Sequence, residues 1–197
     1  MTLWPAFRDL ALETVTAPRM AAERILQFQP GRDWLWQALL CAVVLNALVF
    51  GLSTMIAPPD TELPPMMATP FLFALTMACG LVITIFGVFW VGAWLGGQAR
   101  LDDILVLMTW LQVLRFAVQV VAVPLGIIAP ALTVMGLMVA SILGIWILVN
   151  FIDTAHRFDN LFKAFGVLIF TGMGIAMGMI LMLSIIGVST AGFAADV

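Results

Sequence analysis

Charged residues are scarce in this chain, and that scarcity excludes most soluble folds. Only 10% of its 197 residues are Asp, Glu, Lys or Arg, whereas a typical soluble domain has about 25%. Hydrophobic residues make up 63% of the chain, and the mean hydropathy is +1.15. We therefore expect a single domain embedded in a lipid bilayer and no separate soluble domain. A strongly basic face is also missing, so nucleic acid is not expected as a partner.

Residues that carry catalysis or bind metals are few as well. The chain has one histidine, His156, and two cysteines, and it contains no P-loop, no His-Glu-x-x-His motif and no serine in a nucleophile elbow. Asp153 and Asp159 flank His156 three residues away on either side, which we interpret as local polar pairing. The pair Asp102-Asp103 is interpreted as stabilising the start of a helix. The sequence predicts no catalytic residue, no metal site and no cofactor, so an enzyme is not expected.

What the chain does have is five long apolar stretches, each near the roughly 20 residues that a spanning helix needs. None shows the alternation of apolar and polar residues typical of barrel strands, so each is expected to be a helix. The sequence predicts an all-α fold, a polytopic membrane helical bundle of five transmembrane helices. The first helix is predicted to end before Pro58 and the third before Pro124, because proline interrupts helices. The five stretches are residues 34–57, 70–95, 104–123, 131–152 and 165–187.

These stretches divide the chain into three parts. Residues 1–33 are predicted to form a cytoplasmic amphipathic segment, residues 34–188 the five-helix membrane domain, and residues 189–197 a short periplasmic tail. The first part is expected to form two short helices, the second starting at Pro18, because proline suits the first helical position. This segment is expected to lie in the headgroup plane or to pack on the cytoplasmic ends of the bundle, and both can hold at once.

Basic residues outside the spans all lie on one side of the predicted bundle. They occur before the first span, between the second and third, and between the fourth and fifth, while the opposite connections hold none. Because basic residues favour the cytoplasmic side, we expect the N-terminus in the cytoplasm and the C-terminus in the periplasm. The residues concerned are Arg8, Arg19, Arg24, Arg32, Arg100, Arg157 and Lys163.

One ionisable residue, Arg115, lies inside a predicted span. A charge near the middle of the bilayer costs about 2.5–3.5 kcal/mol on insertion scales, so it calls for polar neighbours. Gln112 and Gln119 lie on the same helical face, and Asn46 of the first span is expected at a similar depth. Three interpretations stay open: a structural hydrogen-bond hub, a contact with anionic lipid headgroups, or the lining of a substrate path.

Small residues recur at four-residue spacing in the last two predicted spans. Without a water-driven hydrophobic effect, such residues mark where membrane helices approach closely. We expect these faces to be crossing points within one chain, with a homodimer interface as the alternative. The residues are Gly136, Ala140 and Gly144 in the fourth span and Gly174 and Gly178 in the fifth.

Three short segments on the predicted cytoplasmic side carry a recognisable pattern. They are Pro18-Arg19-Met20-Ala21 leading to Pro30, Leu95-Gly96-Gly97 followed by Leu101-Asp102-Asp103-Ile104, and His156-Arg157-Phe158 leading to Lys163-Ala164. Together with the five-span layout, they resemble the bacterial branch of the Yip1-domain family of five-span membrane proteins. The chain differs from the eukaryotic branch, because it lacks that branch's longer soluble N-terminal region and its Asp-Leu-Tyr-Gly-Pro-type motif.

The resemblance implies a multi-pass protein of the bacterial inner membrane that acts without catalysis. We expect a membrane organiser, or an accessory or scaffold subunit of a membrane complex. The expected partners are the lipid bilayer and either a membrane protein complex or a second copy of the chain. The alternative function is a small transporter or lipid-handling protein built around Arg115.

Overall fold

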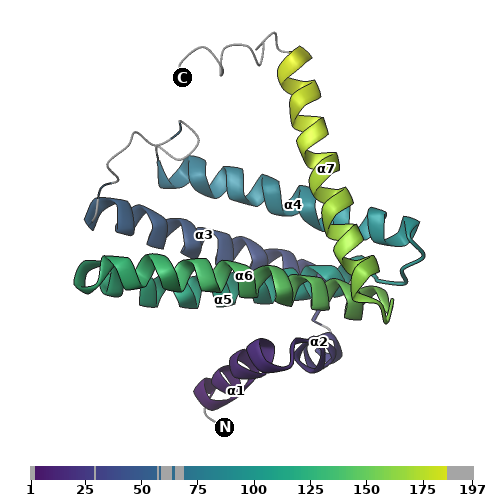
Figure 1. Cartoon of the computed structure of the whole chain (residues 1–197), viewed down its shortest axis with the longest axis horizontal. Coiled ribbons are helices and arrows are strands. Elements are labelled where there is room, and N and C mark those ends of the chain that lie inside the picture. The colour runs from purple at the N-terminus through teal and green to yellow at the C-terminus, as the bar shows by residue number, and fades with distance from the viewer. Residues whose placement is uncertain (1–2, 29, 57, 59–63, 65–68, 186–197) are drawn as a thin grey trace.

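The computed structural model describes residues 3–28, 30–56, 58, 64 and 69–185, and this part of the chain forms helices and no strands (Figure 1). The predicted end of the fifth span at Gly187 and the predicted tail at residues 189–197 lie outside the described residues. The helices are α1 (Leu3–Thr16), α2 (Pro18–Gln27), α3 (Arg32–Ile56), α4 (Pro70–Trp94), α5 (Leu101–Ile128), α6 (Pro130–His156) and α7 (Leu161–Ile185).

The five long helices, α3 to α7, are each long and apolar enough to cross a membrane. This confirms the predicted all-α fold with five candidate membrane-spanning helices. Helices α3, α4, α5 and α6 run alongside one another, and α5 packs most extensively on α3 and α6 (Figure 1). Their lengths of 25 to 28 residues correspond to about 38–42 Å of helix at 1.5 Å per residue, enough to cross the hydrocarbon core.

The third span is longer than the sequence predicted. Helix α5 continues through Pro124 to Ile128, so the predicted end near Val123 is wrong. Proline leaves one carbonyl of the preceding turn without its N–H donor, but membrane helices tolerate this interruption. The chain turns instead at Ala129, and Pro130 opens α6, where its missing N–H leaves no hydrogen bond unmade.

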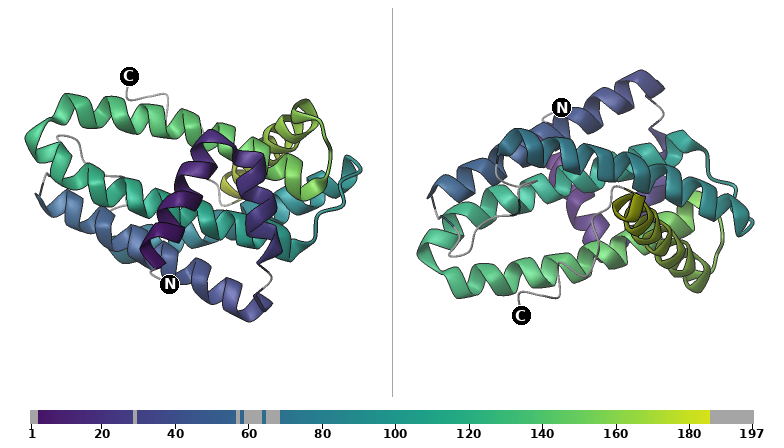
Figure 2. Two further views of the ribbon diagram at one scale, coloured as in Figure 1. Left: turned by 90° about the horizontal axis from the view of Figure 1, so that it is seen from below. Right: turned by 90° about the horizontal axis from the view of Figure 1, so that it is seen from above.

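The two N-terminal helices pack against the bundle, as Figure 2 shows from below. Helix α2 begins at Pro18, as predicted, and buries Ala21, Ala22 and Ile25. Helix α1 is held to α5 by a hydrogen bond from Trp110 Nε1 to Thr14 Oγ1, 3.0 Å long. The expectation that this segment packs on the bundle is therefore confirmed, and its position relative to lipid headgroups stays a prediction.

The hydrophobic core lies toward one end of the bundle, which we call the junction end. Helices α3, α5 and α7 begin there, and α4 and α6 end there. Six consecutive residues of α5, 104–109, are buried at this end. A helix buried on every side must be surrounded, and α5 is enclosed here by α2, α3, α4 and α6. The junction end is therefore the most closely packed part of the described chain.

Helix α7 leaves the bundle at a steep angle (Figure 1). It crosses α4 near Gly87, where an added Cβ would lie 2.6 Å from Thr171 Cγ2. Beyond Thr171, every described side chain of α7 except Ile175 is exposed. The outer half of α7 thus presents an apolar surface to whatever surrounds the chain.

The glycines expected at crossing points do not lie at them. An added Cβ would meet nothing within 4 Å at Gly136, Gly144, Gly174 or Gly178. The interpretation of these glycines as contacts within one chain is therefore corrected. Helix α7 diverges from the bundle before Gly174 and Gly178 reach another helix, and Gly136 and Gly144 lie on a part of α6 that no other described helix approaches closely. Ala140 on the same face of α6 is only partly buried. The alternative, contact with another chain, stays a prediction.

Candidate functional site

The junction end brings His156 into a closed space between two connections. The side chain of His156 is 1% exposed. Its imidazole lies so close to Gly92 and Gly97 that a Cβ on either glycine would overlap the ring. The Gln98 N–H donates to the His156 carbonyl oxygen over 3.1 Å, and the Phe158 ring stacks on the imidazole with 5.1 Å between centroids. Glycine is required beside His156 because no other residue leaves room for the ring.

Asp153 joins the N-terminal helices to the turn between α6 and α7. Its carboxylate is 2% exposed and forms an ion pair with Arg19 of α2. The other carboxylate oxygen accepts a hydrogen bond from the Asn160 N–H at 2.8 Å. Arg157 and Asp159 in this turn have positive φ angles of 56° and 49°, so the turn depends on contacts such as this one.

These contacts correct the local pairing predicted around His156. Asp153 pairs with Arg19, which is 134 residues away in the sequence, and not with the histidine. Within the described residues, neither ring nitrogen of His156 has a side-chain hydrogen-bond partner, and the backbone of Val88 is the polar group that interacts with the imidazole. Hydrophobic packing and the stack on Phe158 therefore hold the imidazole in place.

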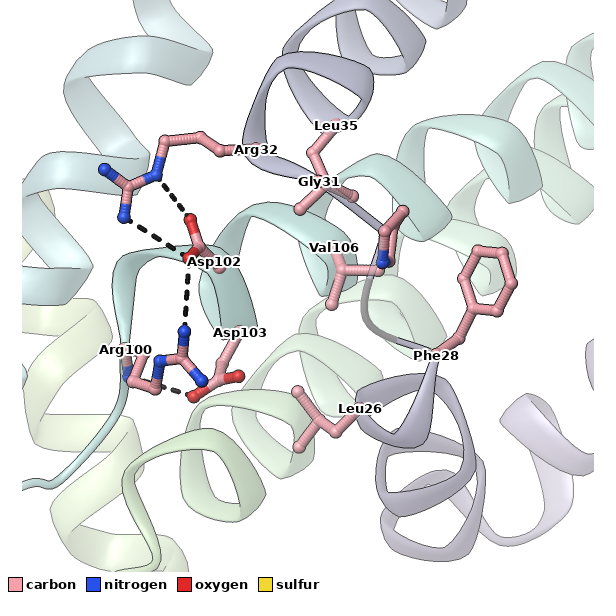
Figure 3. A pocket seen from close by; sticks show the side chains of 10 residues that line it. Leu26, Phe28, Gly31, Arg32, Leu35, Arg100, Asp102, Asp103 and Val106 are labelled. Atoms are coloured by element: carbon pink, nitrogen blue, oxygen red, sulfur yellow. Dashed lines mark hydrogen bonds and ion pairs between the residues drawn. The ribbon is translucent and has the colours of Figure 1, made fainter.

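A cavity of about 230 Å³ opens at the junction end between the α2–α3 connection and the start of α5 (Figure 3). Two arginines and two aspartates line it. Arg32 Nε donates to Asp102 Oδ1 at 2.6 Å, and Arg100 Nη2 lies 3.5 Å from Asp102 Oδ2. Asp103 Oδ2 accepts from the Arg100 N–H at 3.0 Å. Asp103 thus stabilises the start of α5, as predicted, while Asp102 holds both guanidinium groups.

The predicted polar stripe in the third span is formed only in part. Asn46 is fully buried, and its amide donates to the carbonyl oxygens of Ala42 at 2.7 Å and Gln112 at 3.1 Å. Helices α3 and α5 are therefore joined by the hydrogen bond from Asn46 to the Gln112 carbonyl oxygen.

Arg115 is not the hub of this stripe. The residue lies on the exposed side of α5, and its side chain makes no hydrogen bond or ion pair with any residue that the structure describes. The side-chain oxygens of Asn46, Gln112 and Gln119 are buried without a hydrogen-bond partner in the same part of the chain. The structure thus places a cation and three acceptors near one another without joining them.

Metal ligands do not gather anywhere in the described ranges, since no group of three His, Cys, Asp or Glu residues could hold an ion there.

The Yip1 domain family model matches residues 12–190. The chain belongs to the Yip1 domain family. No curated protein and no solved structure matches it.

Membership of the Yip1 domain family confirms the resemblance to that family drawn from the three short segments, and the bacterial branch stays a prediction. All three lie within the matched residues and come together at the junction end. Gly97 of the second segment lies against His156 of the third, and Arg19 of the first pairs with Asp153, three residues before His156. Multi-span membrane proteins make up this family. The contacts between these segments could not be predicted from local sequence patterns, because the segments are far apart along the chain.

Proposed function

We propose that this Yip1-domain protein acts without catalysis in the bacterial inner membrane, as a membrane organiser or as an accessory or scaffold subunit of a membrane complex. One observation carries the proposal. The outer half of α7 is apolar and rich in small residues, its described side chains are exposed except that of Ile175, and nothing lies within 4 Å of a Cβ added at Gly174 or Gly178. A glycine-lined helix that diverges from its own bundle is suited to pack against a transmembrane helix of another chain.

The proposed orientation has the junction end in the cytoplasm and the C-terminus in the periplasm. It is supported by the arginines at the junction end, Arg19, Arg32, Arg100 and Arg157, because basic residues favour the cytoplasmic side. The tryptophans Trp34, at the start of α3, and Trp94, at the end of α4, lie at the same end, as expected for a membrane interface.

Co-purification tests the proposed function. The full chain is purified from membranes in a mild detergent, and mass spectrometry identifies the proteins retained and their stoichiometry. We expect a second membrane protein or a second copy, lost in Gly174→Leu and Gly178→Leu. Ala176→Leu, on another side of the same helix, serves as the control and should retain the partner. A chain that purifies alone and monomeric from native membranes contradicts the proposal.

A second candidate function, lipid handling or transport built around Arg115, is favoured by the exposed position of this residue near the middle of α5 and the buried acceptors beside it. An unpaired charge at this depth costs several kcal/mol unless something solvates it, so a ligand or lipid there would be strongly held.

Two substitutions at Arg115 separate these functions. Arg115→Leu should fold at least as well as the parent, because it removes a charge that has no partner within the described chain. If Arg115 binds a lipid or ligand, this variant also loses it, whereas Arg115→Lys keeps the charge and part of the binding. Mass spectrometry measures the bound lipid in each variant, and the melting temperature serves as the control for folding. Together they show whether Arg115 binds a lipid or ligand. Unchanged lipid in the leucine variant removes the second candidate.

A further inference from the structure

The cavity at the junction end carries balanced charge. Arg32 and Arg100 contribute two positive charges, and Asp102 and Asp103 contribute two negative charges. All four side chains lie at the rim, where Figure 3 shows them on one side of the opening. Two charges of each sign at one small opening match a ligand that itself carries both signs.

Helix geometry adds to the positive side of this opening. Helix α3 begins at Arg32, and α5 begins at Leu101, one residue after Arg100. The first N–H groups of a helix lack intrahelical acceptors and carry partial positive charge. Two helix starts beside two guanidinium groups therefore favour a phosphate at this end of the cavity.

The inner wall of the cavity is apolar. Leu26, Leu35 and Val106 line it, and Leu35 is 1% exposed. An added Cβ on Gly31, which also lines the cavity, would meet nothing within 4 Å. A ligand with an apolar portion could therefore extend past Gly31 without displacing protein atoms.

The surroundings place the cavity at the level of a membrane interface. The Phe28 ring, which lines the cavity and is 62% exposed, packs edge-on against Trp34 with 6.1 Å between centroids. Exposed aromatic rings at the ends of spanning helices lie at the depth of lipid headgroups. A volume of about 230 Å³ is below the roughly 300–1,000 Å³ of sites that enclose a drug-sized ligand, so it suits a headgroup and not a whole lipid.

We propose that this cavity binds the headgroup of a zwitterionic phospholipid with a primary ammonium group, as in phosphatidylethanolamine. The phosphate lies against Arg32 and Arg100, and the ammonium donates to Asp102 and Asp103. The glycerol and the first acyl carbons pass over Gly31 toward Leu35 and Val106. The inference is independent of the proposed function, because it concerns a different part of the molecule from α7 and Arg115.

The primary ammonium follows from the hydrogen-bonding chemistry of the carboxylates. An ammonium offers three N–H donors to carboxylate oxygens, whereas the quaternary ammonium of phosphatidylcholine offers none. An anionic headgroup such as that of phosphatidylglycerol would leave Asp102 and Asp103 facing a negative charge. The site should therefore prefer phosphatidylethanolamine over both.

Native mass spectrometry of the full chain in detergent tests the proposal. Phosphatidylethanolamine, phosphatidylcholine and phosphatidylglycerol with identical acyl chains are added separately at equal concentration. We expect one tightly bound phosphatidylethanolamine per chain and at least about tenfold weaker retention of the other two, since each charge-assisted hydrogen bond is among the stronger polar contacts. Equal retention of the three lipids overturns the proposal.

Two variants and a matched control locate the site. Arg32→Gln should weaken phosphatidylethanolamine retention about tenfold, and Gly31→Leu should do so by filling the cavity without changing any charge. Arg24→Gln is the control, because Arg24 and Arg32 side chains are both 57% exposed and each pairs with one partly buried acid. Unchanged retention in Gly31→Leu and Arg32→Gln, or equal loss in Arg24→Gln, contradicts the assignment.

Glycerophosphoethanolamine, which has the headgroup but no acyl chains, tests whether the site serves a lipid. It should fail to displace the bound lipid at the same concentration, because it lacks contacts with Leu35 and Val106. Full displacement would assign the cavity to a water-soluble phosphate compound and overturn the lipid proposal.

Discussion

Single residues at the junction end are constrained by the size of their neighbours. His156 fills the space beside Gly92 and Gly97 so completely that a methyl group at either glycine overlaps its ring. Overlap of this kind forces side chains off their preferred rotamers or shifts the backbone, and it usually costs about 1–3 kcal/mol. Gly92 and Gly97 are thus explained by packing against His156, whereas Gly96 is explained by its positive φ of 87°, which glycine adopts most readily.

Gly92→Ala should lower the stability of the chain by about 1–3 kcal/mol, although alanine favours helices more than glycine. Gly80→Ala in the same helix is the control, because nothing lies within 4 Å of an added Cβ there. Thermal unfolding in detergent measures both. The double variant Gly92→Ala/His156→Ala should show a coupling of about 0.5–3 kcal/mol, and strict additivity would show that the two residues are not in contact.

Arg19 is expected to matter more for stability than the other arginines of the N-terminal helices. Arg19→Gln leaves the buried Asp153 carboxylate without its cation, which should cost about 1–3 kcal/mol. Arg24→Gln breaks a pair that is largely in solvent and should cost about 0–1 kcal/mol. Melting temperatures in detergent rank the two. Adding Asp153→Asn to Arg19→Gln should restore part of the loss, because the buried charge is then gone; no restoration would mean that the ion pair does not stabilise the junction.

Among the helices, the sequence predicted which segments are helical far better than how they meet. The five apolar stretches and the helix start at Pro18 follow from local composition and spacing. The end of α5 was predicted wrongly from the sequence, because a membrane helix tolerates the proline at position 124. The glycines at helix crossings were also predicted wrongly. A glycine permits close approach, but the path of the neighbouring helix determines whether that helix passes the glycine. Gly87, which the sequence did not single out, lies at the crossing of α4 and α7, while Gly174 does not.

Because Gly87 lies at a helix crossing and Gly174 does not, alanine at the two positions should change stability in different directions. Gly87→Ala should destabilise the isolated chain by about 1–3 kcal/mol, since its Cβ would lie 2.6 Å from Thr171 Cγ2. Gly174→Ala should leave the isolated chain unchanged or slightly more stable, because nothing lies close to it and alanine favours helices. Unfolding of the monomer in detergent measures both changes. Equal destabilisation would mean that α7 packs along the bundle over its whole length.

At the scale of the whole molecule, one arrangement brings the separate features together. Three connections lie at the junction end: the one before α3, the one between α4 and α5, and the one between α6 and α7. The three short segments, the cavity and seven of the eight basic residues lie at or near these connections. An odd number of spans is what allows these connections to share one side while the chain ends on the other. The Yip1 domain match and the five apolar helices establish a membrane protein, and the orientation is the part that remains to be measured.

Reporter fusions test this arrangement most directly. A reporter that is active only outside the cytoplasm, and a second that is active only inside it, are fused in turn after Phe158 and after Val197. We predict that the Phe158 fusion reports from the cytoplasm and the Val197 fusion from the periplasm. Fusions at both positions that report from the same side would contradict the five-span arrangement, and a periplasmic Phe158 would contradict the proposed orientation.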